Sequence, residues 1–366
     1  MKISILIPVY KTPKYFVDIV QKLLSSDYEN KEIIGVIDGE ITPEIKSALD
    51  ELNGKIAIIC PNDHLGKVKV LNKAVENIKT DIILFLDNDI LLPEDPHFLS
   101  TLSKEMNNHD IVEMPKEVIA QSVYSAMIGY EYLSFAMACF TFSKLAGKSP
   151  CLIGAAFAVK KELFDKLGGF KQVVYEDGDF GARAFRIHAR YSYDTRLKVK
   201  TTMPNNLSDW MKQRKRWTLV NVLWFKDNFL YLLSRVFRHP TLIITLLIII
   251  LPAIISTLLL IIFNQLNITF IIPVFFMVAQ PLQFLTGILL FFTHYALISQ
   301  GIMSTLLGFI VSVVSYYVFS LFIKFRFNFF EFILYYTFYL PVLIIANLVI
   351  FIIMLGRKSI DLDWKV

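Results

Sequence analysis

The feature that most constrains the fold is an abrupt loss of charge along the chain. Residues 1–235 carry most of the Asp, Glu, Lys and Arg side chains, whereas residues 241–328 contain two formal charges, Lys324 and Arg326. One membrane helix needs only about 20 apolar residues. The chain is 55% hydrophobic and 19% charged, against about 45–50% and about 25% in soluble domains. We therefore expect a globular amino-terminal domain with its own core and a carboxyl-terminal membrane domain.

Four apolar runs in the second part are each long enough to span a bilayer. They cover about residues 240–263, 268–293, 301–323 and 329–355. Four spans that start in the cytoplasm would leave Lys324 and Arg326 outside, so the alternative is that one run is interfacial or re-entrant. We expect an integral protein of the cell membrane with about four transmembrane helices and a cytoplasmic tail at residues 356–366.

The amino terminus does not resemble a signal peptide, because the apolar run at residues 3–7 is short and ends at Pro8. The globular domain is therefore expected in the cytoplasm. Basic residues cluster at 212–238, just before the first apolar run, as the positive-inside rule predicts near anionic membrane lipids. Nucleic-acid binding is not expected, since no basic patch occurs elsewhere.

Strand and helix patterns alternate in the globular part. Strands are expected at residues 3–9, 32–37, 56–60 and 81–86, and helices at 13–25, 42–52 and 67–77. This order predicts an α/β fold with a parallel sheet, whose ligands bind beyond the carboxyl ends of the strands. Residues 126–142 are expected to form a helix, either against the membrane or in the core, and residues 151–160 a strand.

Asp87-Asn88-Asp89 places two carboxylates directly after the buried strand at 81–86. Hard oxygen ligands of this kind suit Mg²⁺ or Mn²⁺, which keeps waters and bridges to substrate phosphates. The alternative is a solvated loop, because Asp and Asn are common after strands. The position at the end of a strand–helix series favours the metal site.

Two further residues are candidates for nucleotide contacts. Asp38 follows the strand at 32–37 and could accept hydrogen bonds from a base or ribose, although an Asp before Gly39 is also a common turn. Lys67 opens a predicted helix, where a lysine and free backbone N–H groups suit a diphosphate. A plain surface lysine is the alternative.

A second acidic cluster, Glu176-Asp177-Gly178-Asp179, could supply a general base that deprotonates an acceptor hydroxyl for attack on an anomeric carbon. A plain surface loop is the alternative. Further along, Arg216 could pair with phosphate and Trp217 could stack on a sugar face. Both types are also enriched at membrane interfaces, which is the alternative for them.

The order of these motifs resembles membrane-bound family 2 glycosyltransferases with a GT-A domain, the group of hyaluronan, chitin and cellulose synthases and ceramide glucosyltransferase. The matching residues lie between residues 3 and 220. They are Ile5-Leu6-Ile7-Pro8-Val9-Tyr10, Val36-Ile37-Asp38-Gly39, Gly66-Lys67, Leu71-Asn72, Asp87-Asn88-Asp89, Gly154, Lys160-Lys161, Gly168-Gly169-Phe170, Glu176-Asp177 and Gln213-Arg214-Lys215-Arg216-Trp217.

The resemblance implies a role for each candidate. Asp38 would contact the nucleotide base, and Lys67 and Arg216 the diphosphate. Asp89 would bind the metal, with Asp87 on the nucleotide and metal side. Asp177 would be the catalytic base. The acceptor and diphosphate would be held by the remaining candidates, which are Gln213, Arg216, Trp217, Glu176 and Gly154.

The resemblance therefore implies an inverting, metal-dependent membrane glycosyltransferase. Its donor would be a nucleotide sugar, with a UDP-sugar favoured over a GDP-sugar. Its acceptor would be a growing glycan, as in polysaccharide synthases, or alternatively a single membrane lipid. Polysaccharide synthases usually carry membrane helices before the catalytic domain, and this sequence shows none there. A non-catalytic export scaffold and a polyprenyl-phosphate sugar synthase are disfavoured, and an oligomer is compatible with the sequence.

The expected domains follow from these assignments. They are a GT-A domain at residues 1–205, amphipathic interface helices with the Gln213–Trp217 motif at 206–239, transmembrane helices at 240–355 and the tail at 356–366.

Overall fold

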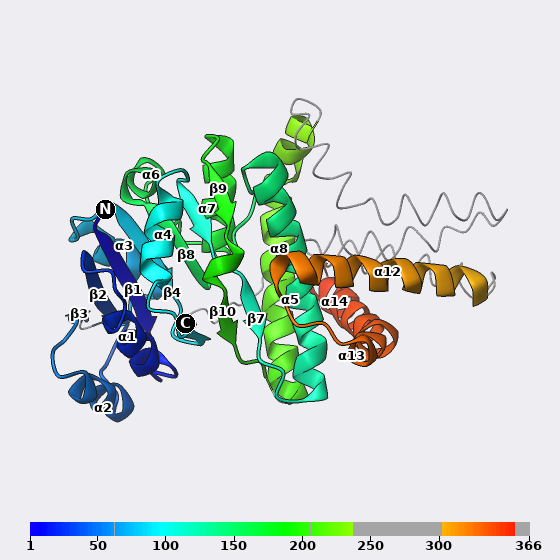
Figure 1. Cartoon of the computed structure of the whole chain (residues 1–366), viewed down its shortest axis with the longest axis horizontal. Helices are drawn as coiled ribbons and strands as arrows, with labels where there is room; N and C mark the ends of the chain where they lie inside the picture. Colours follow the sequence, from blue (N-terminus) through cyan, green and yellow to red (C-terminus); the bar gives the residue numbers. More distant parts are fainter. Residues whose placement is uncertain (62, 205, 237–301, 356–366) are drawn as a thin grey trace. The chain divides into compact units, whose positions relative to one another are not determined.

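A computed structural model describes residues 1–355 except residues 62, 205 and 237–301 (Figure 1). The chain packs as two compact units. Among the described residues, the α/β unit comprises Met1–Glu117 and Gly147–Thr202, and the helical unit comprises Val118–Ala146, residues 203–236 and residues 302–355.

The α/β unit is built on a seven-stranded sheet with the order β3-β2-β1-β4-β8-β6-β9. Its strands are β1 (Ile3–Val9), β2 (Lys31–Ile37), β3 (Ala57–Ile59), β4 (Ile82–Leu86), β6 (Ile111–Glu113), β8 (Ala156–Lys160) and β9 (Tyr191–Tyr193). β1 pairs in parallel with both β2 and β4, from Ile3 opposite Lys31 to Val9 opposite Ile37 on the β2 side. All five residues of β4 are buried, as expected for a parallel strand covered on both faces.

Helices cover this sheet, and a small second sheet has the order β5-β10-β7. The helices are α1 (Phe16–Leu24), α2 (Pro43–Leu52), α3 (Lys67–Glu76), α4 (Phe98–Met106), α6 (Lys161–Lys166) and α7 (Glu176–Arg186), with a 3₁₀ turn at Thr195–Leu197. The small strands are β5 (Ile90–Leu91), β7 (Lys116–Val118) and β10 (Val199–Thr201). α1 forms because Phe16, Ile19, Val20 and Leu23 recur at helical spacing and all enter the core.

Strand direction determines where the loops converge. β8 is antiparallel to both β4 and β6, so β4 and β6 point the same way as β1 and β2. The predicted parallel α/β arrangement is thus confirmed for these strands. Their carboxyl ends meet at one edge of the sheet, termed here the carboxyl edge.

The expected strand at residues 151–160 is wrong in its first half, since β8 begins at Ala156. Residues 151–155 form a loop because Gly154 adopts a φ of +74°, which breaks the extended path. The amide of Ile153 also donates to a side chain rather than to a neighbouring strand.

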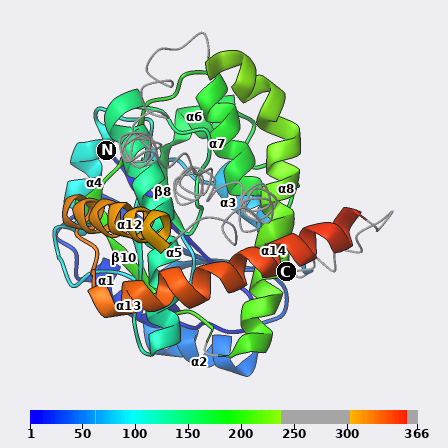
Figure 2. The same cartoon turned by 90° about the vertical axis from the view of Figure 1, so that its right-hand side faces the viewer.

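The helical unit contains α5 (Val123–Thr141), followed by a π-helical turn at Phe142–Ala146, and the long helix α8 (Leu207–Val236). It also contains α12 (Ile302–Ile323), α13 (Phe329–Leu334), a π-helical turn at Tyr335–Tyr339 and α14 (Leu340–Leu355). α14 packs across α8, and α12 and α13 pack on α5 (Figure 2). The segment at 126–142, expected as a helix, is α5 and belongs to this unit.

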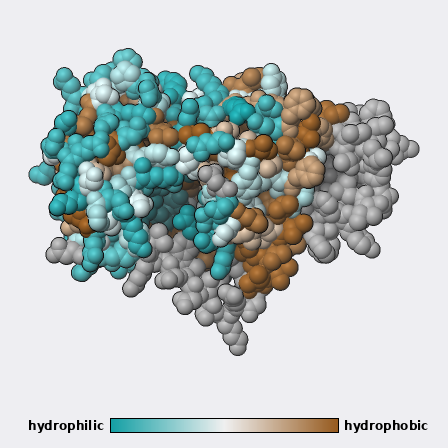
Figure 3. Space-filling model, turned by 90° about the horizontal axis from the view of Figure 1, so that it is seen from below, coloured by the Kyte–Doolittle hydropathy of each residue, from teal (hydrophilic) through white to brown (hydrophobic). Residues whose placement is uncertain are grey.

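α13, the π-helical turn and most of α14 form one continuous helix, Phe329–Ile353. Within the described residues, this is the one helix that is long and apolar enough to cross a membrane. The apolar part of α12, Gly308–Ile323, is shorter. Large apolar side chains point outward from both segments, among them Leu321, Phe322, Phe330, Phe338 and Ile345, and the hydrophobic surface they form is brown in Figure 3. The expected spans at 240–263 and 268–293 lie outside the described residues, so the count of four stays a prediction.

Candidate active site

Three predicted site residues meet at the carboxyl edge. Asp87 follows β4, Lys67 is the first residue of α3 and Glu176 begins α7. The Nζ of Lys67 lies 2.7 Å from Oδ1 of Asp87 and 3.9 Å from Oε1 of Glu176. Burial alone would lower the pKa of Lys67, but the carboxylates of Asp87 and Glu176 outweigh it and raise that pKa. Lys67 is therefore a permanent positive charge at the strand ends.

Asp177 lies beside this cluster in the first turn of α7. Burial raises the pKa of Asp177, and the nearby Asp87 carboxylate adds to the shift. Burial and the charge of Asp177 likewise raise the pKa of Glu176. The Gly178 amide donates a 2.7 Å hydrogen bond to Oδ1 of Asp177 and fixes that oxygen. The other carboxylate oxygen, Oδ2, faces Gly154 in the loop at residues 151–155.

Two glycines let the loop at residues 151–155 approach α7 closely. A Cβ on Gly154 would lie 2.7 Å from Cγ of Asp177, and one on Gly181 would lie 2.8 Å from the Leu152 nitrogen. Real Cβ atoms do not tolerate such distances, so any side chain at either position would displace its neighbour. Gly154, predicted on the acceptor side, thus lies directly against the predicted base.

Glu113 is a functional candidate that the sequence analysis missed. It ends β6 at the carboxyl edge and is 2% exposed. Its Oε1 accepts from the Ile153 amide at 2.6 Å, and its Oε2 accepts from the Tyr191 hydroxyl at 2.7 Å. Burial raises the pKa of Glu113 to about 7. The carboxyl group therefore anchors the loop that lies against Asp177, and its place after the apolar pair Ile111-Val112 was the available signal.

Asp89 differs from Asp87 in its surroundings. Its side chain is exposed, and no side-chain partner for it occurs in the described part of the chain. Its backbone oxygen accepts from Thr201 Oγ1 at 3.3 Å, next to the pairing of Ile90 with Thr201 between β5 and β10. The small sheet thus holds the loop and leaves the carboxylate available to a ligand.

Among the described residues, no group of three His, Cys, Asp or Glu side chains could by itself hold a metal ion. Mg²⁺ is commonly held by one or two carboxylates together with substrate phosphates and waters. The exposed Asp89 carboxylate and the Asp87 carboxylate, which also pairs with Lys67, fit this way of holding a metal ion. They do not fit a site in which protein side chains alone surround the ion.

Asp38 lies at the end of β2 and is 5% exposed. Its Oδ1 accepts from the Leu65 amide at 2.8 Å, and its Oδ2 lies 3.0 Å from Nδ1 of His64. The His64 ring stacks on Tyr10, with centroids 4.7 Å apart and planes at 22°. Tyr10 follows β1 as Asp38 follows β2, so these aromatic rings occupy the same edge. His64 is not among the predicted site residues, and no motif marks it.

A reciprocal pair of hydrogen bonds joins α3 to the turn before α7. The Asn72 side chain donates to the Phe170 oxygen at 2.8 Å and accepts from the Phe170 amide at 2.9 Å. From α7, Arg183 donates to the oxygens of Leu167 at 2.6 Å and Gly169 at 2.9 Å. These contacts hold the helices that carry Lys67 and Asp177 in a fixed relation within the α/β unit.

The predicted acceptor residues Gln213, Arg216 and Trp217 all lie on α8, at the i, i+3 and i+4 spacing of one helix face. Arg216 is exposed, and Gln213 and Trp217 are partly exposed. The intervening Arg214 is fully buried and forms an ion pair with Glu131 of α5. Arg214, which is not one of the predicted acceptor residues, thus anchors the Gln213–Trp217 motif.

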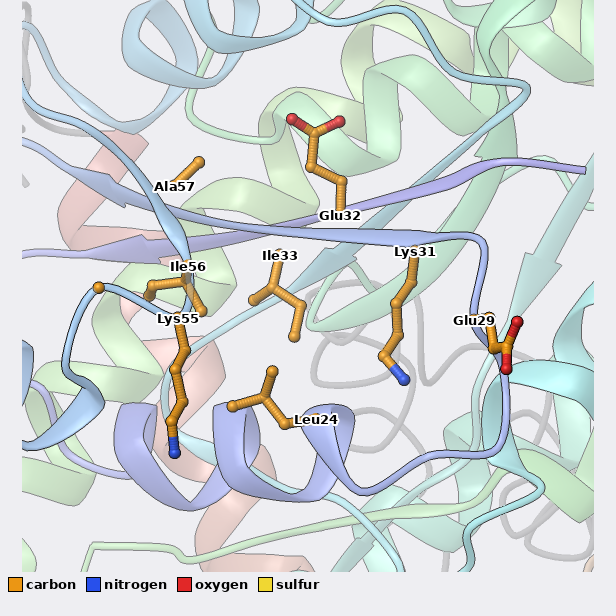
Figure 4. A pocket seen from close by; sticks show the side chains of 9 residues that line it. Leu24, Glu29, Lys31, Glu32, Ile33, Lys55, Ile56 and Ala57 are labelled. Atoms are coloured by element: carbon orange, nitrogen blue, oxygen red, sulfur yellow. The ribbon is translucent and has the colours of Figure 1, made fainter.

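A hollow with a volume of about 500 Å³ lies elsewhere on the described surface (Figure 4). It lies at the amino ends of β2 and β3, where Leu24, Lys31, Ile33, Lys55 and Ala57 are among its lining residues. Asp38 stands at the opposite end of β2, so this hollow is not part of the candidate site.

The family model for Glycosyl transferase family group 2 matches residues 82–279, more than half of the chain. The poly-beta-1,6-N-acetyl-D-glucosamine synthase of Staphylococcus aureus is 25% identical over 228 residues, which covers 59% of this chain and 53% of the synthase. Glycosyltransferase GlyG of Streptococcus pneumoniae serotype 4 is 28% identical over 110 residues, 30% of this chain and 36% of GlyG. The matched part therefore spans about half or less of these relatives.

Among solved structures, the mannosyltransferase PcManGT from Pyrobaculum calidifontis, in complex with GDP-Man and Mn²⁺, has a TM-score of 0.56. The match covers 95% of this chain and 86% of that chain at 16% sequence identity. The likeness shows a shared GT-A-like fold.

Proposed function

The chain belongs to glycosyl transferase family group 2 and is a glycosyltransferase, and from this premise we propose that it moves a sugar from a nucleotide sugar to a growing glycan at a membrane. The proposed transfer inverts the anomeric carbon and depends on a divalent metal ion. The observation that carries the proposal is the cluster of Lys67, Asp87, Glu176 and Asp177 at the carboxyl edge.

On the donor side, Lys67 would bind the diphosphate through its ammonium group, which its neighbours keep protonated. Asp38 would contact the base, together with the stacked rings of Tyr10 and His64. Asp89, with Asp87, would hold Mg²⁺ or Mn²⁺, and the ion when bound would offset the charge of the diphosphate. The complex of PcManGT with GDP-Man and Mn²⁺ supports a divalent metal and a nucleotide-sugar donor. A UDP-sugar is the favoured donor and a GDP-sugar the alternative.

The proposed chemistry is a single displacement in which Asp177 acts as the base. The acceptor hydroxyl transfers its proton to a carboxylate oxygen of Asp177 while its oxygen bonds to the anomeric carbon. The bond from that carbon to the diphosphate oxygen breaks, and its electron pair leaves with the nucleoside diphosphate. A raised pKa suits Asp177 to this role, because general bases work best when their pKa is close to the working pH.

On the acceptor side, Gln213, Arg216 and Trp217 would bind the glycan and the diphosphate. The apolar exterior of α12 and of Phe329–Ile353 supports a membrane location for the helical unit, with the α/β unit in the cytoplasm (Figure 3). The similarity to the S. aureus synthase supports polymer extension over the transfer of one sugar.

The test is product analysis with membranes that carry the full chain and a panel of radiolabelled UDP- and GDP-sugars. A ladder of glycan lengths is expected. A single product that extracts with lipid would support the alternative, transfer of one sugar to a membrane lipid. The absence of transfer from every donor would contradict the proposal.

The variant Asp177→Asn tests the base. Transfer should fall by about 10²–10⁴-fold, the usual contribution of a general base, while nucleotide binding persists. Asp165→Asn is the matched control, because Asp165 is exposed and its ion pair among the described residues is with Lys161 on α6, at 2.6 Å. Undiminished transfer by Asp177→Asn would refute the assignment of the base.

A further inference from the structure

Arg214 occupies an unusual position for a charged residue. Its side chain is 0% exposed, as is that of its ion-pair partner Glu131 on α5. The other oxygen of Glu131 accepts from the Tyr339 hydroxyl at 3.1 Å, which in turn accepts from Trp210 Nε1 at 3.0 Å. Such buried pairs add little net stability compared with apolar residues of similar size. A reason other than stability is therefore needed for its presence.

The contacts of Arg214 lead to two motif residues. Its guanidinium carbon lies 4.4 Å from the centre of the Trp217 ring and 5.6 Å from that of Trp210. Its second terminal nitrogen donates to Gln213 Oε1 at 3.3 Å. One planar group thus contacts the side chains of both Gln213 and Trp217 and is itself fixed by a buried carboxylate on another helix.

We propose that Arg214 is a positioning residue for the acceptor: it fixes the ring of Trp217 and the amide of Gln213 in the orientation that binds the acceptor sugar. The inference rests on the proposed function of this motif and adds a residue to it. Arg214 covers one face of the indole, and the partly exposed Trp217 keeps surface for a sugar. A lysine cannot replace it, because an ammonium group lacks the plane and the fork needed for these contacts together.

The experiment is a double-mutant cycle in the full-length protein in membranes, with Arg214→Lys, Trp217→Phe and the double variant. Two rates are measured, namely transfer to the acceptor and release of nucleoside diphosphate by hydrolysis without acceptor. Arg214→Lys should lower transfer by about 100-fold, the scale for a misplacement of 1 Å, and should lower hydrolysis of the donor far less than transfer. In the Trp217→Phe background the same substitution should have little further effect, because interacting sites are not additive.

Two controls separate positioning from packing. Thr218→Val removes another buried contact of α8, the 2.7 Å hydrogen bond from Thr218 to Asn347, and should lower thermal stability without a selective loss of transfer. Lys215→Ala changes an exposed neighbour and should behave as the parent does. If Thr218→Val reproduces the profile of Arg214→Lys, or if Arg214→Lys costs the same in both backgrounds, the inference is overturned.

Arg214→Met with Glu131→Leu removes both charges, so that no lone buried charge prevents folding. This double variant should fold, hydrolyse the donor and lose transfer to the acceptor, and transfer at the parental rate would overturn the inference. A parent protein that neither transfers nor hydrolyses any nucleotide sugar would overturn the proposed function and this inference with it. An active parent with an equally active Arg214→Lys would overturn this inference alone.

Discussion

The approach of Gly154 to Asp177 can be tested by adding a single carbon atom. Gly154 has a φ of +74°, and a Cβ there would lie 2.7 Å from Cγ of Asp177. Gly154→Ala therefore has two effects, backbone strain and displacement of the proposed base. Gly54→Ala is the matched control, because Gly54 has a φ of +69° and nothing within 4 Å of the added carbon.

The expected magnitudes differ between the two variants. The left-handed backbone costs an alanine roughly 1–2 kcal/mol at either position. At Gly154 the overlap adds about 1–3 kcal/mol, the usual cost of overpacking. If the overlap shifts Asp177 by about 1 Å, turnover should fall by about 100-fold, which corresponds to about 2.7 kcal/mol of transition-state stabilisation. Gly54→Ala should lose stability only.

The assay measures thermal unfolding and initial transfer rates of both purified variants at a temperature where each is folded. Gly154→Ala should be slow but folded, with the donor KM close to the parental value. A folded Gly154→Ala with parental turnover would refute the reasoning, since either the loop does not fix Asp177 or Asp177 is not the base. Equal loss of turnover in Gly54→Ala would assign the effect to strain instead.

Two further substitutions test neighbouring groups. The pKa of Glu113 in the folded protein is about 7, above the usual 4.5. Between pH 4.5 and pH 7 the folded protein therefore binds more protons than the unfolded protein. The free energy of unfolding should fall as the pH rises through this range, by up to about 3 kcal/mol. Glu113→Gln should flatten this dependence in unfolding measured at pH 5 and pH 8, and an unchanged slope would exclude Glu113 as its source. Asp89→Asn should weaken the dependence of donor binding on Mn²⁺ in a titration of nucleotide affinity, and an unchanged Mn²⁺ dependence would remove Asp89 as a ligand.

The sheet and its edge could be predicted from local pattern. The continuous apolar runs at 3–9 and 81–86 became β1 and β4 nearly to the residue, because a strand buried on both faces needs such a run. Asp87 was predicted from a strand end and Lys67 from a helix start, whereas Glu176 was predicted from its acidic cluster and the helix that it begins was not expected. Their proximity follows from parallel topology, which the alternation of strands and helices already implies.

The residues that sequence analysis missed depend on partners far away in the chain. Glu113 bonds to Ile153 and Tyr191, 40 and 78 positions further along. Arg214 pairs with Glu131, 83 positions before it. The local signal for Glu113 is no more than its place after Ile111-Val112, and Arg214 has none that separates it from its basic neighbours, so the tertiary fold is needed to identify both. The loop at 151–155 was mistaken for a strand for the same reason, since the buried carboxylate that binds its backbone lies outside any local window.

The charges at the carboxyl edge bear on the proposed metal. Asp87, Asp89, Glu176 and Asp177 are carboxylates in this region, and Lys67 is the cation in direct contact with two of them. A nucleoside diphosphate sugar would bring further negative charge into a site where burial already raises the pKa of Glu176 and Asp177. Like charges this close repel strongly where water is scarce, and Lys67 and Lys116, whose charges both act on Asp177, offset only part of this negative charge. A divalent cation at Asp89 would supply the missing positive charge and leave Asp177 ionised, as a base must be. Donor affinity should therefore fall more on removal of Mn²⁺ at pH 8 than at pH 5, where protonation of the carboxylates relieves part of the repulsion, and equal losses at both pH values would contradict this account.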